Sequence, residues 1–183
     1  MHAVDAINEV WLTYQVTKDA LKITTHGINR GAIELLQDTF FINSSTDKAK
    51  NDLAICRRAA GDYAILSMWA IFERYVSDAL VRENGKMLDV PPSEFNSALH
   101  RKIEEAIEYW RANDVLDLIK PLVGADLVGK AKQIKRYRDW LAHKNPKKAS
   151  PGNVPPTVAY QVFSDILQLL SFHRSELTEK LML

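Results

Sequence analysis

The chain has a single cysteine, Cys56, among its 183 residues. One cysteine cannot form a disulfide within the chain, and it cannot build a cysteine-based zinc site. Glycine and proline are also scarce, at seven each, which argues against a turn-rich β sandwich or barrel. Because Cys56 falls within a helical pattern, we expect it to be a small packed residue.

Long apolar runs are missing as well. The longest, from Tyr63 to Phe72, is about ten residues with Ser67 inside it, which is too short to span a bilayer and typical of a buried core helix. The start, Met1–Asp5, lacks the basic and apolar segments of a signal peptide. The five histidines show no zinc-binding spacing, and there is no glycine-rich phosphate loop. We therefore expect a cytoplasmic protein with no membrane span, cofactor or metal.

Apolar residues recur at spacings of three, four and seven over most of the chain, which indicates helices. The pattern predicts helices over residues 3–25, 48–84, 94–111, 127–144 and 157–182, with a shorter one over 113–119. No segment alternates with the period of a strand. The sequence therefore predicts one all-α domain over 1–183, an antiparallel bundle of roughly five to seven helices. Gly61, inside the second long helix, predicts a kink or a close helix crossing.

Positive charge is concentrated near the end of the 127–144 helix. Between Lys130 and Lys148 the chain has eight lysines and arginines and one acid, a local net charge of +7 against +1 for the whole chain. Residues 89–117 instead hold seven acids and three lysines or arginines. We expect a basic face opposite an acidic one, suited to local phosphate binding, with a solvated helix face as the alternative. The candidate nucleic-acid-binding residues are Lys132, Lys135, Arg136, Lys144, Asn145, Lys147 and Lys148.

Within this stretch, Arg138 and His143 are the residue types that metal-free RNA cleavage needs. An arginine grips phosphate oxygens with a planar fork of donors, and a histidine can transfer protons near neutral pH. Metal-free cleavage uses the 2′-OH of the RNA as nucleophile and needs both abilities. A five-residue step rotates by about 140°, so the two residues do not share a helix face. They converge only if His143 lies at the helix end or if a second subunit completes the site, and Lys144-Asn145-Pro146 favours an end there.

The segment Arg138-Asp139-Trp140-Leu141-Ala142-His143 resembles the Arg-x4-6-His motif of the HEPN superfamily. In that motif the residue after the arginine is commonly Asn, Asp or His, which favours Arg138 over Arg136. The apolar segment Met68–Tyr75, with Glu73 embedded in it, is similar to the second core helix of many members. The resemblance covers roughly residues 48–182. Residues 1–45 are expected to be a family-variable helical decoration.

The resemblance implies a helical bundle, usually a homodimer, in which two Arg-His motifs line a cleft. Many members are metal-independent ribonucleases of toxin-antitoxin or other defence systems. If the roles of the family motif apply to the matching positions of this chain, Arg138 would contact the scissile phosphate and His143 would be the general base or acid. Asp139 would then orient the site, and Glu73 would face the motif. For Glu73, pairing with Arg74 or Arg138 is an equal alternative. The sequence departs from Arg-x4-His-x-Tyr at Asn145, which argues against pairing with an antitoxin that modifies the tyrosine.

Three hypotheses follow for the function. The first is a dimeric RNA endonuclease of a toxin-antitoxin or defence system. The second is a non-catalytic HEPN-like module that binds RNA or a partner protein through the Lys130–Lys148 face. The third is a helical interaction protein in which the basic patch is incidental, and separate burial of Arg138 and His143 would favour it. The four tryptophans are expected to be core or interface residues, with Trp140 of special interest between the two candidate catalytic residues.

Overall fold

The computed structural model describes residues 3–86, 88, 90–143 and 149–180, and within these ranges the chain is helical with no strand. This confirms the predicted all-α class. In chain order the described elements are α1 (Ala3–Asn29), α2 (Ile33–Leu36), α3 (Thr46–Gly85), α4 (Ser93–Ala106), the 3-10 turn η1 (Ile107–Tyr109), α5 (Ala112–Val123), α6 (Ala125–His143) and α7 (Pro156–Lys180).

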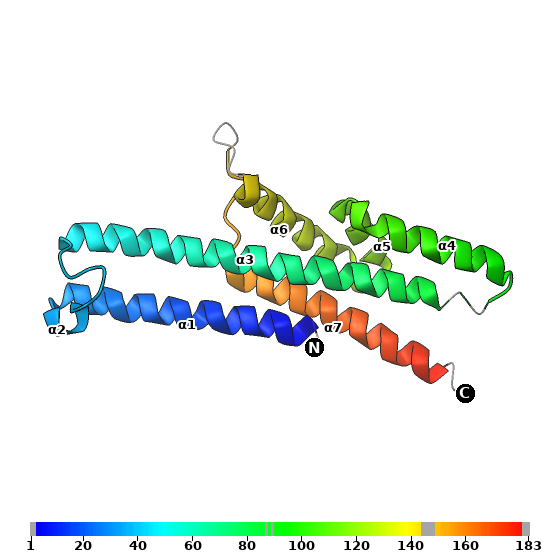
Figure 1. The fold of residues 1–183 in the computed structure, drawn as a ribbon, viewed down its shortest axis with the longest axis horizontal. Helices are drawn as coiled ribbons and strands as arrows, with labels where there is room; N and C mark the ends of the chain where they lie inside the picture. Colours follow the sequence, from blue (N-terminus) through cyan, green and yellow to red (C-terminus); the bar gives the residue numbers. More distant parts are fainter. Residues whose placement is uncertain (1–2, 87, 89, 144–148, 181–183) are drawn as a thin grey trace.

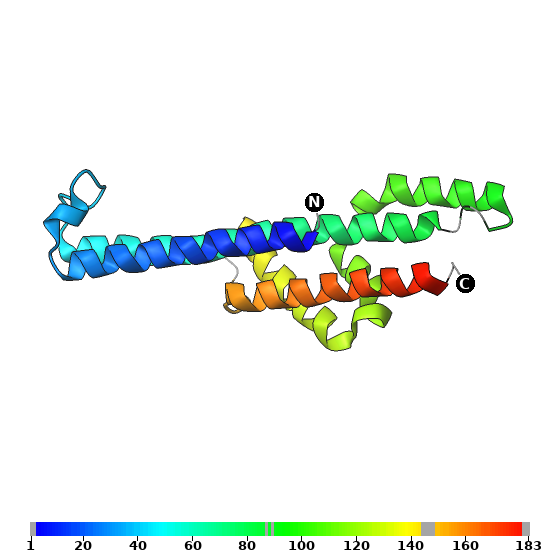
Figure 2. The same cartoon turned by 90° about the horizontal axis from the view of Figure 1, so that it is seen from below.

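The molecule is elongated rather than spherical. Helices α1 and α3 run antiparallel side by side, and their distal parts, with α2 at the tip, extend beyond the other helices (Figure 1). A small apolar cluster of Ile28, Ala49 and Leu53 holds this arm together. Helix α7 packs along one side of the α1/α3 pair (Figure 2). The main core therefore lies in one half of the molecule only.

Helix α3 is the central element of the fold. The Ser45 side chain accepts a hydrogen bond from the backbone of Lys48 at 3.4 Å, which caps the helix start. Further along, Trp69 and Phe72 are 1% and 2% exposed, so the apolar segment is a core helix as predicted. Helices α1, α4, α5, α6 and α7 all contact α3. Because other helices pack against α3 on several sides, its apolar residues occupy more than one face of the helix.

The core is centred on a set of aromatic rings between α3 and α7. Phe163 of α7 stacks on Phe72 with ring centroids 4.5 Å apart, and its ring lies 5.9 Å from that of Trp69. Helices α5 and α6 close this core with their own apolar stripes, including Leu116 and Ile134. The indole of Trp69 thereby lies at the junction of α3, α6 and α7.

The N-terminal helix also contributes to this core. Ile7 of α1 is completely buried with the residues of α3 and α7, and Trp11 stacks on Tyr160 of α7 at 4.7 Å. Residues 1–45, expected as a decoration, thus include a helix whose first half packs into the principal core. Only its second half belongs to the arm.

Two residues singled out from the sequence have clear places in the fold. Gly61 lies at a close crossing, because a Cβ at this position would stand 3.2 Å from Pro156 at the start of α7. Cys56, in contrast, is exposed on α3, so the expectation that it is a packed residue was wrong. It lines a groove that is formed by residues of α1 and α3 alone. Over the described residues, no helix is long and apolar enough to cross a membrane.

Candidate active site

Helix α6 carries Arg138, Asp139 and His143. Gly124, with φ at 91°, links it tightly to α5 in a backbone conformation that favours glycine. The described helix runs to His143, and the helix end expected at Lys144-Asn145-Pro146 lies outside the described residues. Its buried stripe has the spacing of one helix face: Val128, Ala131, Ile134, Tyr137 and Leu141. Arg138 and Asp139 follow Tyr137 directly and so lie at the edge of the buried face.

The position of α6 against α3 is fixed by Tyr137. Its hydroxyl donates a hydrogen bond to Asp62 Oδ1 of α3 at 2.8 Å, and its Oη also lies 3.4 Å from Asn153 Oδ1. Burial of the phenol, followed by the hydrogen bond and negative charge of Asp62, raises the pKa of Tyr137 to about 12. The ring also stacks on Trp140 at 6.0 Å. This contact anchors the half of α6 that carries the candidate site.

The raised pKa of Tyr137 predicts a loss of stability in alkali. A folded-state pKa above the unfolded value of about 10 means that the contribution is complete below pH 10 and is lost as the pH rises toward 12. Chemical unfolding at a series of pH values should show a steeper decline through this window for the wild type than for Tyr137→Phe. We also expect that variant to be less stable at neutral pH by about 1 kcal/mol. Parallel declines in the two proteins would contradict the assignment.

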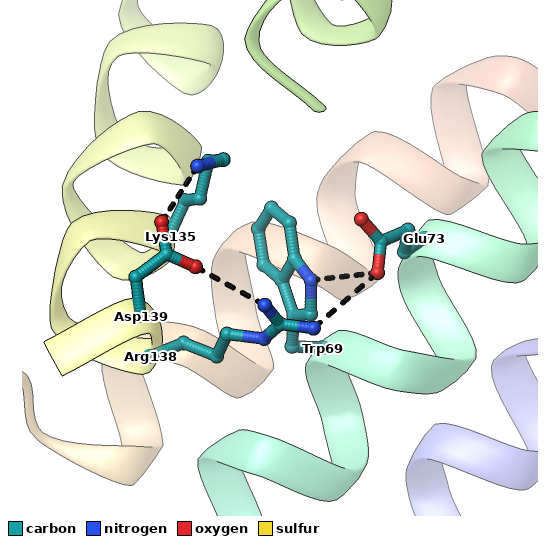
Figure 3. Close-up of polar contacts among 5 residues, drawn as sticks. All are labelled: Trp69, Glu73, Lys135, Arg138 and Asp139. Carbon is teal, nitrogen blue, oxygen red and sulfur yellow. Dashed lines mark hydrogen bonds and ion pairs between the residues drawn. The ribbon is translucent and has the colours of Figure 1, made fainter. Parts of the chain in front are cut away.

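The guanidinium of Arg138 is the centre of a polar cluster between α6 and α3 (Figure 3). Its Nη1 donates to Asp139 Oδ1 at 3.1 Å, and its Nη2 lies 3.6 Å from Glu73 Oε2. The Cζ atom lies 5.7 Å from the centroid of the Trp69 ring, within the range of a cation–π contact. Two carboxylates and one aromatic ring therefore hold a side chain that is still 31% exposed.

Asp139 has cationic partners on both sides. Lys135 Nζ donates to its Oδ2 at 2.6 Å, while Arg138 occupies Oδ1. Partial burial raises the pKa of the Asp139 carboxyl, but the hydrogen bonds and charges of Lys135 and Arg138 lower it by more, so the net pKa is below its ordinary value. Asp139 therefore stays ionised and holds one side of the Arg138 guanidinium. Its role in orienting a catalytic site stays a prediction.

Glu73 connects this cluster to a neighbouring groove. Its Oε2 accepts from the Trp69 indole Nε1 at 3.0 Å and also pairs with Arg138. Of the two arginines considered for it, Arg138 is the partner, whereas Arg74 pairs with Asp78 at 3.1 Å. The same carboxylate lines a groove of about 460 Å³ between α3, η1 and α5. Glu73 thus pairs with Arg138, which is the alternative that the sequence left open for it.

His143 lies apart from the cluster in the single chain. It is exposed at the last residue of α6 and belongs to the same helix as Arg138, but among the described residues no contact joins the two. Neither residue is buried, so the separate burial that would have favoured an incidental basic patch is not observed. The rotation of a five-residue helical step accounts for their separation.

The basic stretch is less positively charged than the sequence suggested. Lys132 pairs with Asp117 of α5 at 2.6 Å, and Lys130 pairs with Asp126 at 2.8 Å. The expected separation of a basic and an acidic face is therefore wrong at this point, because α5 packs directly beside α6. Arg136 is exposed, and no contact between it and a carboxylate is found in the described part of the chain. Lys144, Asn145, Lys147 and Lys148 lie outside the described residues.

Two participants were not identified from the sequence. Trp69 was expected to be a core residue, yet its indole N–H fixes Glu73 and its ring lies beside Arg138. The four-residue spacing of Trp69 and Glu73 was the available signal, since such pairs are neighbours on a helix. Lys135 was expected to bind nucleic acid, but in the structure it holds Asp139. Lys135 and Asp139 have the same four-residue spacing within α6. Only the packing of α6 on α3 shows that Trp69 and Glu73 lie beside Arg138.

The assembled site offers a held guanidinium for an anion and, at the helix end, an exposed imidazole for proton transfer. In the described part of the chain, no group of three or more His, Cys, Asp or Glu side chains is placed to hold a metal ion. Comparisons with protein-family models, with curated proteins and with solved structures find no match to this chain.

Proposed function

We propose that this protein is a metal-independent RNA endonuclease, with Arg138 binding the scissile phosphate and His143 acting as general acid or base. The observation that supports this proposal is the cluster of contacts around Arg138. A carboxylate on each side and the Trp69 ring hold the guanidinium in one orientation at a partly exposed position. A preoriented, charged donor of this kind is what stabilises developing negative charge on phosphoryl oxygens.

In the proposed reaction the RNA supplies its own nucleophile. The 2′-OH loses its proton to a base and attacks the phosphorus, the bond to the 5′ oxygen breaks, and that oxygen takes up a proton. Arg138 has five N–H donors, of which the pairs with Asp139 and Glu73 use two, so donors remain for phosphoryl oxygens. The product carries a 2′,3′-cyclic phosphate, and no water or metal enters this step.

The site requires two copies of the chain in this proposal. Arg138 and His143 are joined by no contact among the described residues of one chain. Two α6 helices facing each other across a two-fold axis would place an arginine and a histidine from different copies in one cleft. We propose a cytoplasmic homodimer that acts in a toxin-antitoxin or defence system, in line with the HEPN resemblance of the Arg138–His143 segment.

A second candidate function is a non-catalytic module that binds RNA or a partner protein. The pairing of Arg138 with two carboxylates favours it, because these contacts compete with phosphate for the guanidinium. Such a module would bind RNA through the exposed cations of α6, for example Arg136, with an affinity that falls steeply with salt.

Incubation with labelled RNA in EDTA separates the two candidates. The endonuclease is expected to turn over many RNA molecules per chain and to leave 2′,3′-cyclic phosphate ends. Salt-sensitive binding without product would instead establish the binding module. Cleavage that stops in EDTA and returns with added Mg²⁺ would contradict the proposed chemistry.

A further inference from the structure

The chain exposes more surface than a compact monomer of its mass. Its accessible surface is 12404 Å², whereas a compact monomer of 20.8 kDa exposes about 8,900 Å². The excess of about 3,500 Å² reflects the elongated shape and is several times the roughly 800 Å² that each partner buries in an ordinary stable interface. The arm formed by α1 and α3 has no other helix layer beside it (Figure 1).

A groove opens along the α1/α3 pair. It has a volume of about 760 Å³ and is lined by six side chains of α1 between Ala6 and Thr17 and by seven of α3 between Cys56 and Ile71. We call it the α1–α3 groove. Helix α7 contacts other residues of the same two helices, through Trp11 on α1 and Phe72 on α3. The groove is therefore on a face that α7 leaves uncovered.

The chemistry of the α1–α3 groove suits permanent burial. Of the thirteen side chains that line it, only Glu9 carries a charge. Thr13 and Thr17 donate their hydroxyls to backbone carbonyls of α1 at 2.9 and 2.8 Å, so covering them leaves no unmet donor. Elsewhere on the same two helices, four more apolar side chains are 58 to 68% exposed: Leu12, Val16, Ile23 and Ile55. An uncharged interface core is typical of lasting association.

The α1–α3 groove has both an exposed ring and a region of small side chains into which such a ring could fit. Tyr63 is 68% exposed and lines the groove together with small residues, among them Ala59, Ala60 and Thr13. A protruding ring and a hollow of small side chains on one face are what a two-fold contact requires, since each copy must present both. Glu9 lies toward one end of the groove, so an antiparallel pairing keeps the two Glu9 carboxylates apart.

We propose that a second copy of this chain covers the α1–α3 groove, so that the α1/α3 pairs of the two copies form a four-helix layer about a two-fold axis. Tyr63 of each copy inserts among the small residues of the other. Glu73, Arg138 and His143 do not line this groove, so this two-fold contact is separate from the cleft of the proposed function and can be measured without RNA. A chain that makes both contacts forms an assembly larger than the dimer of the proposed function.

Light scattering of the full chain tests the pairing. The wild type is expected to have at least twice the mass of one 20.8 kDa chain at micromolar concentration, and Tyr63→Glu is expected to halve the observed mass. The matched control is Tyr109→Glu, because Tyr109 is an even more exposed tyrosine on η1, outside the groove. Its mass should equal that of the wild type. A wild type that stays at the mass of one chain, or equal masses for wild type and Tyr63→Glu, would overturn the proposal.

Cys56 gives a second readout that uses the unmodified protein. It lines the α1–α3 groove and is the only cysteine, so its reaction with a thiol reagent reports on this face alone. We expect protection at high protein concentration and faster reaction on dilution, and fast reaction at every concentration in Tyr63→Glu. Cys56 reacting at the same rate in the assembled wild type and in that variant would count against the groove as the interface, even if the chain associates elsewhere.

Discussion

Replacement of His143 by alanine is expected to reduce RNA cleavage by a factor of about 10²–10⁴, the usual contribution of a general acid or base. The exposed position of the imidazole at the end of α6 means that its removal leaves no cavity. We therefore expect the unfolding curve and the RNA affinity to stay close to those of the wild type. The measurement is single-turnover cleavage of labelled RNA in EDTA, beside a binding isotherm for the same RNA.

The matched control for this prediction is His26→Ala. His26 is also an exposed histidine in the last turn of a helix, but it belongs to α1 and lies in the arm. It shares the local setting of His143 without the neighbouring Arg138 cluster. Full cleavage by His143→Ala protein would remove this residue from the mechanism, and an equal loss in His26→Ala would show that the effect is not specific to the site.

The second large effect is expected at Arg138. Arg138→Ala removes the donors for the phosphoryl oxygens and the positive charge held by Glu73 and Asp139, so we expect cleavage to fall by about 10² or more. Arg138→Lys restores the charge but not the planar fork, and should recover only part of the rate. Because the two ion pairs are partly exposed, the free energy of unfolding should fall by only about 1 kcal/mol or less.

Arg136→Ala is the matched control for Arg138. Arg136 is exposed on the same helix and satisfies a looser version of the Arg-x4-6-His spacing, but it lies outside the cluster of Glu73, Trp69 and Asp139. We expect it to weaken RNA binding modestly, with a smaller salt dependence, and to leave the cleavage step unchanged. If Arg136→Ala lost as much cleavage as Arg138→Ala, the general positive charge of α6 and not the held guanidinium would explain the activity.

Mixing the two inactive variants tests whether the site is shared between copies. A mixed dimer of Arg138→Ala and His143→Ala chains has one cleft with both residues intact and one with neither. Random exchange should then recover up to about a quarter of the wild-type activity. Activity that stays absent after exchange of subunits has been demonstrated would place both residues of a working site in the same chain.

Part of the candidate site follows from the sequence alone. The apolar spacing predicted a helix over residues 127–144, and the structure confirms a helix over Ala125–His143. The same spacing showed that Arg138 and His143 lie on different faces, because helix geometry is fixed by the backbone. For Glu73 the sequence left two roles open, and its ion pair with Arg138 is one of the pairings named as the alternative.

The errors share one physical cause. Local charge counting gave the segment from Lys130 to Lys148 a net of +7, but the acids that neutralise Lys132 and Arg138 come from α5 and α3. Likewise, Cys56 is exposed because it lines a groove formed by α1 and α3 alone, without a third helix. Such contacts join residues far apart in the chain, and no periodicity within one helix encodes which helix packs beside it.

The sequence by itself determined the helices of this protein and the residue types available for chemistry. These depend on interactions between residues within about one helical turn, which spacing makes visible. Only the tertiary structure decided that Trp69 and Glu73 hold Arg138, and that the α1–α3 groove stays uncovered. Each of these depends on the packing of separate helices, because burial and charge pairing are set by what the fold brings together.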